Sequence, residues 1–495
     1  MKRDDHVLVI IPPSVALFST VYAILRLGAV AVFIDSNATR RTQLKAALAS
    51  NPVAVIGPAS LVTAHRVARP RTFTCSFEQC DDGTILVPEL NVADSDPVVH
   101  TAPRDDDETA FITFTSGTTG SPKGVPRTHG LLRRQHETIQ ANFPLPQNSV
   151  ALVGFPMLGV HTLSIGCTAA LVRAMPLMTT NEIVELMRLH EVTSAGVAPA
   201  MWRALLDVLD DNDCPQLGVI GTGGSPVPLS VAYRLRQRFP TAERHITYGS
   251  SEAEPIARIS MDDMLHAVEL SRQAPRATHR GGYPVGSGVP EVDVRLIAPS
   301  THDRDDHGFD DRLVSPGQIG EVIVHGDNVV KTYLGDAEAT RTTKIIDTSG
   351  RVWHRTGDLA YVDESDMLWL VGRCGDELQA KDGSTVYPYP VEREIDALPG
   401  VLVSALIAHR ARPHGEVIIH EAPGQCVDVV DVANVLKEFD LQMPIVRMHI
   451  PVDRRIRSKI DRKLLRAQRE GLLLPIRSKM VHLTKHVLET TLAGA

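Results

Sequence analysis

Residues 115–124 read Thr-Ser-Gly-Thr-Thr-Gly-Ser-Pro-Lys-Gly and directly follow the apolar run Phe111–Phe114. Glycines let the backbone turn at positive φ and bring its N–H groups close to a ligand. The hydroxyls add donors, and Lys123 adds a mobile positive charge. A polyphosphate suits such a loop, because many short donor contacts and a cation can hold it. The spacing is not that of a P-loop, and an ordinary turn is the alternative reading.

Length and composition set the broad class of the protein. A chain of 495 residues should contain two or more hydrophobic cores. Its 43% apolar and 22% charged residues are typical of a soluble globular protein. The net charge of −8 offers no footprint for nucleic acid or an anionic membrane, so neither partner is expected. Six scattered cysteines, without a C-x-x-C pair, argue against a zinc site and favour a reducing, cytoplasmic setting.

The apolar N-terminal stretch of residues 7–33 has the length of a signal peptide or a membrane span. Acidic residues precede it, a Pro-Pro pair interrupts it, and Arg26 lies inside it, which argues against both. The pattern fits a strand, a helix and a strand over 7–11, 14–27 and 29–34. We therefore expect the start of a parallel α/β unit and no membrane span.

Short apolar runs alternate with amphipathic helical stretches, such as 181–190 and 200–209, over much of the chain. This alternation predicts an α/β fold with parallel sheets covered by helices on both faces. After Gly281, strand and turn patterns dominate and predict a β-rich subdomain. The expected division is a large N-terminal domain over 1–373 and a small, mobile α+β domain over 374–495.

Two motifs in the middle of the chain add groups suited to a nucleotide. Gly223-Gly-Ser225 follows a buried run, and a glycine pair at a strand end lets a flat aromatic ring lie against the backbone. Tyr248-Gly-Ser-Ser-Glu252 combines an aromatic face, hydroxyls and a carboxylate that can bind magnesium through oxygen.

Two later motifs complete the set. Thr356-Gly-Asp358 presents a carboxylate that can accept from two ribose hydroxyls, with Gly372-Arg373 at the next strand end. Arg457-Ser-Lys-Ile-Asp-Arg462 offers Lys459 on a loop. Five motifs in this order and spacing make the reading of each as an ordinary turn improbable.

In order and spacing, these motifs resemble those of the adenylate-forming superfamily: acyl-CoA synthetases, peptide-synthetase adenylation domains and luciferase-like enzymes. The resemblance runs from about Val7 to Leu465. It implies an AMP-forming ligase that uses ATP and Mg²⁺ to convert a small-molecule carboxylic acid into acyl-AMP, with release of pyrophosphate.

The resemblance also implies roles for individual residues. Lys459 would contact the substrate carboxylate and the α-phosphate, Glu252 would bind magnesium, and Lys123 would neutralise the phosphates; these three form the catalytic set. The implied nucleotide-binding residues are Thr115, Ser116, Gly117, Thr118, Thr119, Gly120, Gly223, Gly224, Ser225, Tyr248, Gly249, Ser251, Asp358 and Arg373.

The chain departs from the family pattern at three places. It is expected to be short at its N-terminus, since relatives carry additional residues before the first strand. The hinge position is Gly375, where many relatives have Asp or Lys, and glycine still permits a swinging C-terminal domain. His161 is displaced from the usual gate of the acyl pocket, so a gate and an ordinary packed histidine are both open readings.

The segments 248–256 and 451–455 resemble one branch in particular, the β-lactone synthetases of bacterial olefin pathways and fatty acyl-CoA ligases. In the first case the β-hydroxyl of the acid displaces AMP, and in the second CoA does so. Both fates are open. Sparse aromatic residues, 4% of the chain, and an expected apolar helix over 152–171 favour a medium- or long-chain aliphatic acid.

Two further alternatives differ in the use of the adenylate. A non-catalytic adenylate-binding relative would be expected to lack Glu252 or Lys459, and both are present. An enzyme that loads a carrier protein would need a separate carrier, because no carrier attachment motif follows the C-terminal domain. A separate acyl carrier and other pathway enzymes therefore stand as candidate partners.

Overall fold

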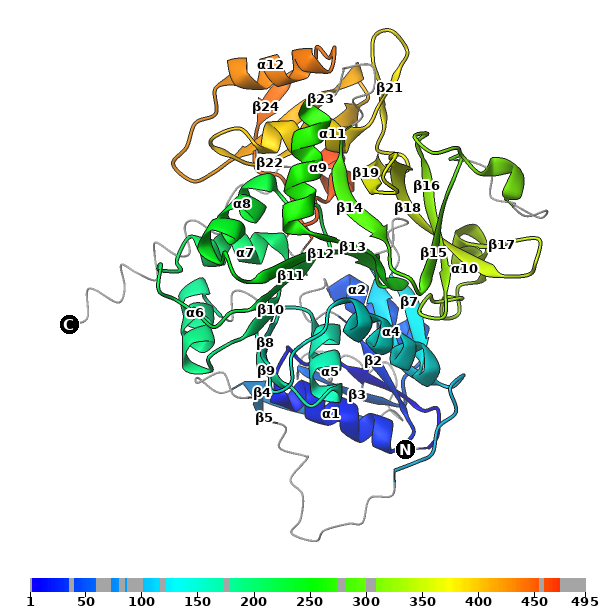
Figure 1. Cartoon of the computed structure of the whole chain (residues 1–495). Helices are drawn as coiled ribbons and strands as arrows, with labels where there is room; N and C mark the ends of the chain where they lie inside the picture. Colours follow the sequence, from blue (N-terminus) through cyan, green and yellow to red (C-terminus); the bar gives the residue numbers. More distant parts are fainter. Residues whose placement is uncertain are drawn as a thin grey trace. The chain divides into compact units, whose positions relative to one another are not determined.

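The computed structural model describes residues 2–34, 40–58, 73–79, 85–86, 101–115, 122–172, 178–273, 281–299, 309–453 and 458–471. Two compact units divide the chain. The first comprises Met1–Gly375 with Asp453–Lys459, and the second comprises Asp376–Val452 with Ile460–Ala495. Both contain helices and sheets (Figure 1), which confirms the mixed α/β fold class. Within the described residues, no helix combines the length and apolarity needed to cross a membrane.

A seven-stranded sheet begins the first unit, with strand order β5-β4-β3-β1-β2-β6-β7. Its strands are β1 (His6–Val9), β2 (Val30–Phe33), β3 (Ala54–Pro58), β4 (Phe73–Gln79), β5 (Ile85–Leu86), β6 (Thr109–Thr115) and β7 (Lys123–Thr128). The inner pairs are parallel, whereas β5 and β7 are antiparallel to their neighbours. The predicted strand–helix–strand start is confirmed, with helix α1 (Val15–Arg26) between β1 and β2.

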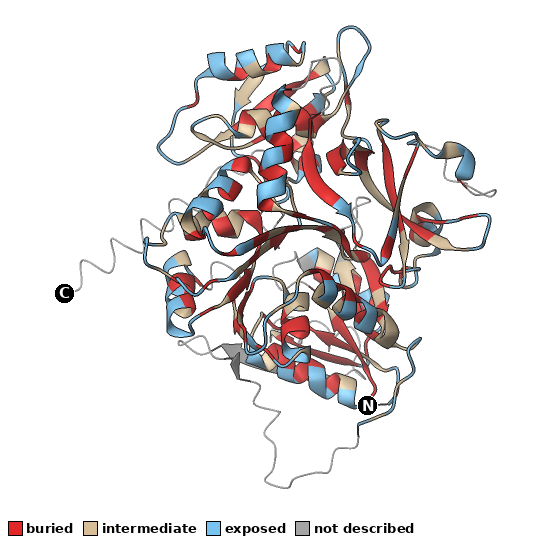
Figure 2. Ribbon diagram, viewed as in Figure 1, coloured by how far each residue is buried: buried red, intermediate tan, exposed pale blue. Residues whose placement is uncertain are grey.

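Alternating residues of this sheet face opposite sides, as the period of a strand requires. Val7 and Val9 pack with α1 residues and with Leu132 and Val160 from α4 (His129–Asn142) and α5 (Pro156–Ser164). Leu8 packs on the other face, against α2 (Arg40–Ser50). Burial on both faces explains why these strands read as continuous apolar runs. The buried strands are visible in red in Figure 2.

A twelve-stranded sheet forms the rest of the first unit. Its strands are β8 (Val150–Val153), β9 (Thr168–Leu171), β10 (Ser194–Gly196), β11 (Val219–Gly223), β12 (Glu243–Ser250), β13 (Ala253–Ser260), β14 (Tyr283–Gly288), β15 (Val292–Ile297), β16 (Gly320–Gly326), β17 (Lys344–Ile346), β18 (Val352–Val362) and β19 (Leu368–Arg373). Strands β8 to β12 pair in parallel, and the later pairs are antiparallel. The predicted parallel arrangement therefore holds for part of each sheet.

The remaining helices of this unit are α6 (Thr180–Leu189), α7 (Pro199–Leu206), α8 (Leu229–Arg238), α9 (Met261–Gln273) and α10 (Ala337–Thr343), with the short 3₁₀ turn η2 (Asp310–Arg312). Two of them, α6 and α7, coincide with the amphipathic stretches predicted over 181–190 and 200–209. The expected apolar helix over 152–171 is wrong. This segment contains the end of β8, the short helix α5 and strand β9. Periodicity alone does not separate a buried strand from a buried helix, and Gly166, at φ 79°, ends the helix early.

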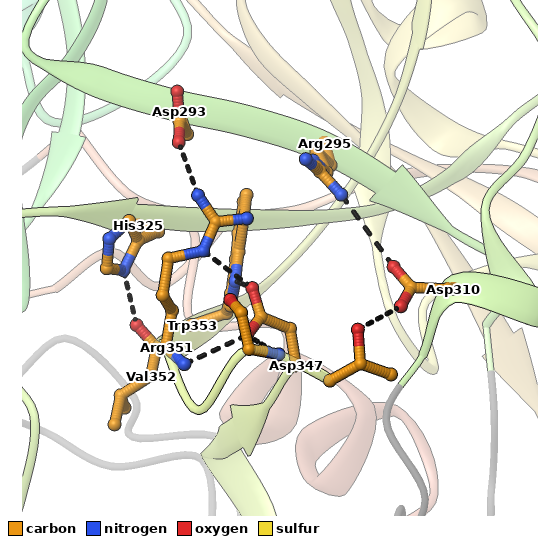
Figure 3. A network of polar contacts seen from close by, with 10 residues as sticks. Asp293, Arg295, Asp310, His325, Asp347, Arg351, Val352 and Trp353 are labelled. Atoms are coloured by element: carbon orange, nitrogen blue, oxygen red, sulfur yellow. Dashed lines mark hydrogen bonds and ion pairs between the residues drawn. The ribbon is translucent and has the colours of Figure 1, made fainter.

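An aromatic and polar network stabilises the β15–β18 part of the second sheet (Figure 3). The indole of Trp353 is fully buried, and its Nε1 donates to Asp347 Oδ2 at 3.0 Å. Arg351 Nε donates to the same carboxylate oxygen at 2.7 Å. The guanidinium carbons of Arg295 and Arg351 lie 4.8 and 5.4 Å from the indole centroid, within range of cation–π attraction. The hydrogen bonds and ion pairs lower the pKa of Asp347 although burial opposes ionisation.

The second unit has its own sheet and core. Its elements are β20 (Leu378–Gln379), β21 (Thr385–Val386), α11 (Pro388–Asp396), β22 (Val401–His409), β23 (Arg412–Glu421), α12 (Val429–Glu438), β24 (Ile445–Arg447) and α13 (Arg462–Arg469). Leu406, Val417 and Ile419 lie in the core. The buried Arg462 bridges α13 to α11, because its Nη2 donates to Glu392 Oε2 at 2.6 Å. The order α11, β22, β23 and α12 gives this unit the α+β character expected from the sequence.

Candidate active site

Three of the predicted residues meet, two of them on the neighbouring strands β18 and β19 and the third on β12. The register places Asp358 on β18 opposite Arg373 on β19, and Arg373 Nε lies 3.3 Å from Asp358 Oδ1. The hydroxyl of Tyr248, on β12, donates to Asp358 Oδ2 at 2.9 Å. Burial and the neighbouring Asp358 carboxylate raise the pKa of Tyr248, so the phenol stays a donor. The sequence suggested that Asp358 lies at a strand end. In the structure it lies within β18.

Further hydrogen bonds fix the main chain next to the Asp358 carboxylate. The backbone N–H of Asp358 donates to Thr356 Oγ1 at 3.0 Å, and Arg373 Nη2 donates to the Thr356 carbonyl at 3.1 Å. These contacts fix the Thr356-Gly-Asp358 motif against the end of β19. The result is an oriented anion beside an aromatic ring, a suitable arrangement for the hydroxyls of a sugar.

A second cluster forms around Glu252, in the turn between β12 and β13. Tyr333 donates from its hydroxyl to Glu252 Oε1 at 2.7 Å. Lys123, at the start of β7, places Nζ 5.2 Å from the centroid of the Tyr333 ring. Burial disfavours the charged form of Glu252, but His354, the Tyr333 hydroxyl and Lys344 outweigh it and lower its pKa. A carboxylate thus stays ionised in a largely buried position.

Sequence reasoning did not identify three members of this second cluster, Tyr333, Lys344 and His354. Tyr333 lies in the loop before α10, where no motif marks it. Lys344 and His354 are directly opposite each other in the β17–β18 register, and both are buried. A lysine before Ile345-Ile346 and a histidine after Val352-Trp353 were the available signal, since buried ionisable groups gather at functional sites.

The Gly223-Gly-Ser segment lies at the end of β11, as predicted. A Cβ on Gly223 would lie 2.4 Å from the Thr247 carbonyl oxygen, so a side chain has no room there. Gly224 has φ 80°, which favours glycine. Ser225 Oγ is buried and has no hydrogen-bond partner among the described residues. The packing of β11 against β12 therefore requires glycine at 223, and the turn that follows places Ser225 Oγ where no described residue satisfies it.

The backbone around Tyr248 is irregular. The β12–β13 register shifts between Tyr248 and Ser250, and Gly249 lies at this bulge. Its absent Cβ would lie 3.0 Å from the Ala253 carbonyl oxygen. Arg127, buried on β7, donates from Nη2 to the Ser251 carbonyl at 2.6 Å. Sequence reasoning missed Arg127, which fixes the main chain of Ser251; the role of the Ser251 hydroxyl stays a prediction.

Part of the predicted phosphate loop can be located. Strands β6 and β7 are antiparallel neighbours, and Thr115 pairs with Lys123. The loop therefore starts and ends at two adjacent strand ends. The predicted phosphate-binding residues Ser116, Gly117, Thr118, Thr119 and Gly120 lie outside the described residues.

Lys459 belongs by its contacts to the first unit, together with the rest of Asp453–Lys459. The adjacent Ser458 Oγ accepts from the backbone N–H of Ala200 at 2.9 Å. Ala200 is in the first turn of α7, whose N-cap makes no side-chain hydrogen bond, so the serine satisfies an otherwise open donor. Lys459 itself is exposed, and its role at the reacting centre stays a prediction.

His161 is a packed histidine. It is buried on α5, and its ring stacks on that of His136 with centroids 5.3 Å apart. Burial and His136 lower the pKa of His161 to about 4. Neither ring nitrogen has a hydrogen-bond partner among the described residues. Of the two readings of this residue, the structure favours the packed histidine, because the ring is enclosed.

Known proteins resemble this chain in sequence and in fold. The olefin beta-lactone synthetase of Stenotrophomonas maltophilia (strain K279a) is 28% identical, covering 94% of this chain and 86% of that protein. The 4-coumarate:CoA ligase 1 of Petunia hybrida is 25% identical, covering 84% and 74%. ATP-bound MatB from Rhodopseudomonas palustris has a TM-score of 0.77 at 22% identity, covering 95% of this chain and 90% of MatB.

A family model establishes the class of the protein. The model described as AMP-binding enzyme matches residues 1–334, which include the loop at 115–124 and the Tyr248–Glu252 turn. With the described geometry of Tyr248, Glu252 and Asp358, this chain belongs to the AMP-binding enzyme family and is an AMP-forming ligase.

Proposed function

We propose that this ligase activates a medium- or long-chain β-hydroxy acid with ATP and Mg²⁺ and then closes the acyl-AMP to a β-lactone. The observation that carries this choice of product is the similarity to an olefin beta-lactone synthetase over 94% of the chain. The acid-activating step has separate support in the ionised Glu252 beside Lys123 and Tyr333.

The described residues fit ATP. Gly223 and Gly224 have no side chain that would cover the flat face of adenine, and Ser225 Oγ, which has no partner among the described residues, would donate to a ring nitrogen. The Asp358 carboxylate, held by Tyr248 and Arg373, would accept from ribose hydroxyls. Lys123 would neutralise charge on the phosphates. Each of these roles is part of the proposal.

Glu252 fits magnesium, because hard cations prefer oxygen ligands and this carboxylate is ionised and oriented. When bound, magnesium supplies Lewis-acid stabilisation of charge on the phosphates. The other roles in acid activation belong to side chains of the protein. Lys459 would bring the acid carboxylate to the α-phosphate and stabilise the charge that develops there. No side-chain nucleophile is required, since the acid itself attacks.

The product decides between a lactone and a thioester. The enzyme is incubated with ATP, Mg²⁺ and a β-hydroxy fatty acid, with and without CoA, and the products are identified by mass spectrometry. In the lactone reaction the β-hydroxyl oxygen forms the new C–O bond, AMP leaves and the hydroxyl proton is released. The tethered nucleophile favours ring closure. We expect a product lighter than the acid by one water, formed without CoA and only from the β-hydroxy acid.

A thioester formed only with CoA would instead establish an acyl-CoA synthetase. That second candidate is favoured by the similarity to 4-coumarate:CoA ligase 1 over 84% of the chain. Pyrophosphate exchange with a panel of aliphatic, aryl and amino acids defines the substrate class. Activity confined to aryl or amino acids would contradict the aliphatic assignment.

Glu252→Gln is expected to raise the Mg²⁺ concentration that gives half-maximal activity by about tenfold or more. The substitution keeps the size of the side chain but removes one hard anionic ligand. The check is a magnesium titration of pyrophosphate exchange at fixed ATP. Glu254→Gln, two residues away on β13, is the matched control. An unchanged titration for Glu252→Gln would remove Glu252 from the metal site.

A further inference from the structure

Tyr333 connects two groups that the proposed function uses separately. Its hydroxyl donates to Glu252 Oε1 at 2.7 Å, and its ring lies under the ammonium of Lys123, with Nζ 5.2 Å from the centroid. One residue thus contacts the proposed magnesium ligand and the proposed phosphate cation. No motif in the sequence gives Tyr333 a role.

The ring of Tyr333 is held in place independently of these two groups. The Nζ of Lys344 also lies near this ring, 5.3 Å from its centroid. The backbone N–H of Tyr333 donates to Thr340 Oγ1 at 3.0 Å, and the ring is 6% exposed. Two lysine side chains near one aromatic ring and a buried setting restrict its orientation. The phenol is therefore aimed at Glu252 before any ligand binds.

Lys344 also ties this cluster to the backbone of the Glu252 turn. Its Nζ donates to the Val330 carbonyl at 2.6 Å, and the Val330 N–H donates to the Glu252 carbonyl at 2.8 Å. Glu252 is thus positioned twice, at its carboxylate by Tyr333 and at its main chain by Val330. Carboxylates that bind metals are typically oriented by such hydrogen bonds.

We propose that Tyr333 is a positioning residue for both groups: its hydroxyl orients the Glu252 carboxylate toward magnesium, and its ring sets the position of the Lys123 ammonium. The inference rests on the proposed function, in which Glu252 binds magnesium and Lys123 binds phosphate. Tyr333 does not itself touch the reacting atoms. Its effect is on the affinity for MgATP, through two separable contacts.

Two substitutions separate the contacts. Tyr333→Phe removes the hydroxyl and keeps the ring, whereas Tyr333→Leu removes both. Binding of ATP is measured by isothermal titration calorimetry, once with EDTA and once across a Mg²⁺ series. For Tyr333→Phe we expect ATP binding in EDTA to be unchanged, and the half-saturating Mg²⁺ concentration to rise by about tenfold. For Tyr333→Leu we expect both measurements to worsen, because Lys123 also loses its ring contact.

Tyr361→Phe is the matched control, because Tyr361 is a buried tyrosine of β18 that stacks on Trp369. It should leave both measurements unchanged. A double variant, Tyr333→Phe with Glu252→Gln, should need no more Mg²⁺ than Glu252→Gln alone, since the hydroxyl acts through the carboxylate. Additive effects would overturn the inference, and thermal melting verifies that each variant folds.

The experiments distinguish a wrong metal ligand from a wrong role of Tyr333. If Glu252→Gln raises the magnesium requirement and Tyr333→Phe does not, the positioning role of Tyr333 is wrong and the proposed metal ligand stands. If Glu252→Gln has no effect on MgATP binding, the metal assignment fails and the inference about Tyr333 fails with it. Equal losses for Tyr333→Phe with and without Mg²⁺ would make the hydroxyl a purely structural group.

Discussion

Replacing Lys459 by alanine is expected to lower the rate of acyl-AMP formation by about 10²–10³-fold, the usual loss when a group that stabilises developing charge is removed. ATP binding should change little, because the ammonium would act on the reacting carboxylate and α-phosphate and not on the nucleoside. The large effect follows from where the charge develops. An interaction made mainly in the transition state changes kcat more than it changes affinity for the substrate.

Single-turnover formation of acyl-AMP, measured beside ATP binding by calorimetry, checks this prediction. The control is Lys463→Ala, which removes another exposed lysine, four residues further along the chain in helix α13. It should leave both quantities near those of the parent protein. Parallel losses of ATP binding and turnover in Lys459→Ala would contradict a role at the reacting centre and make Lys459 a structural or nucleotide-binding residue.

Trp353→Ala is expected to reduce the free energy of unfolding by about 3–5 kcal/mol, the typical cost of deleting a large buried aromatic side chain. The indole is fully buried, packs edge-on against Phe309 with centroids 5.4 Å apart, and donates to Asp347. Its removal leaves a cavity and takes one donor from a buried carboxylate. The same strand carries Asp358, so nucleotide binding should weaken as the strand loosens.

Trp353→Phe is the matched comparison, because it keeps most of the apolar volume and removes the Nε1–H that donates to Asp347 at 3.0 Å. We expect a smaller loss than for Trp353→Ala. Urea unfolding followed by circular dichroism measures both. Equal losses would mean that the hydrogen bond, and not the buried volume, dominates; a negligible loss for Trp353→Ala would contradict the stabilising role of the network.

The sequence predicted the local elements well where the pattern had a physical period. The strand–helix–strand start is confirmed, because two-faced burial of β1 and β2 and the one-sided burial of α1 produce different spacings of apolar residues. The segment 152–171 failed for the complementary reason. The segment is apolar along most of its length, even at the exposed Leu163, so no polar period separates a short helix between two short strands from one long apolar helix.

The sequence by itself determined which chemical groups are available and where chain turns present them: Tyr248, Glu252 and Asp358 each stand in a recognisable motif. Only the tertiary structure decided which of them meet. The Tyr248–Asp358 hydrogen bond joins residues 110 positions apart, and the Tyr333–Glu252 bond joins residues 81 apart. Such contacts depend on strand order and register, which arise from the packing of whole sheets. Tyr333 stands in no motif, and the sequence around Lys344 does not show which distant carboxylate the lysine lies near, because only the packing of the sheets brings these groups together.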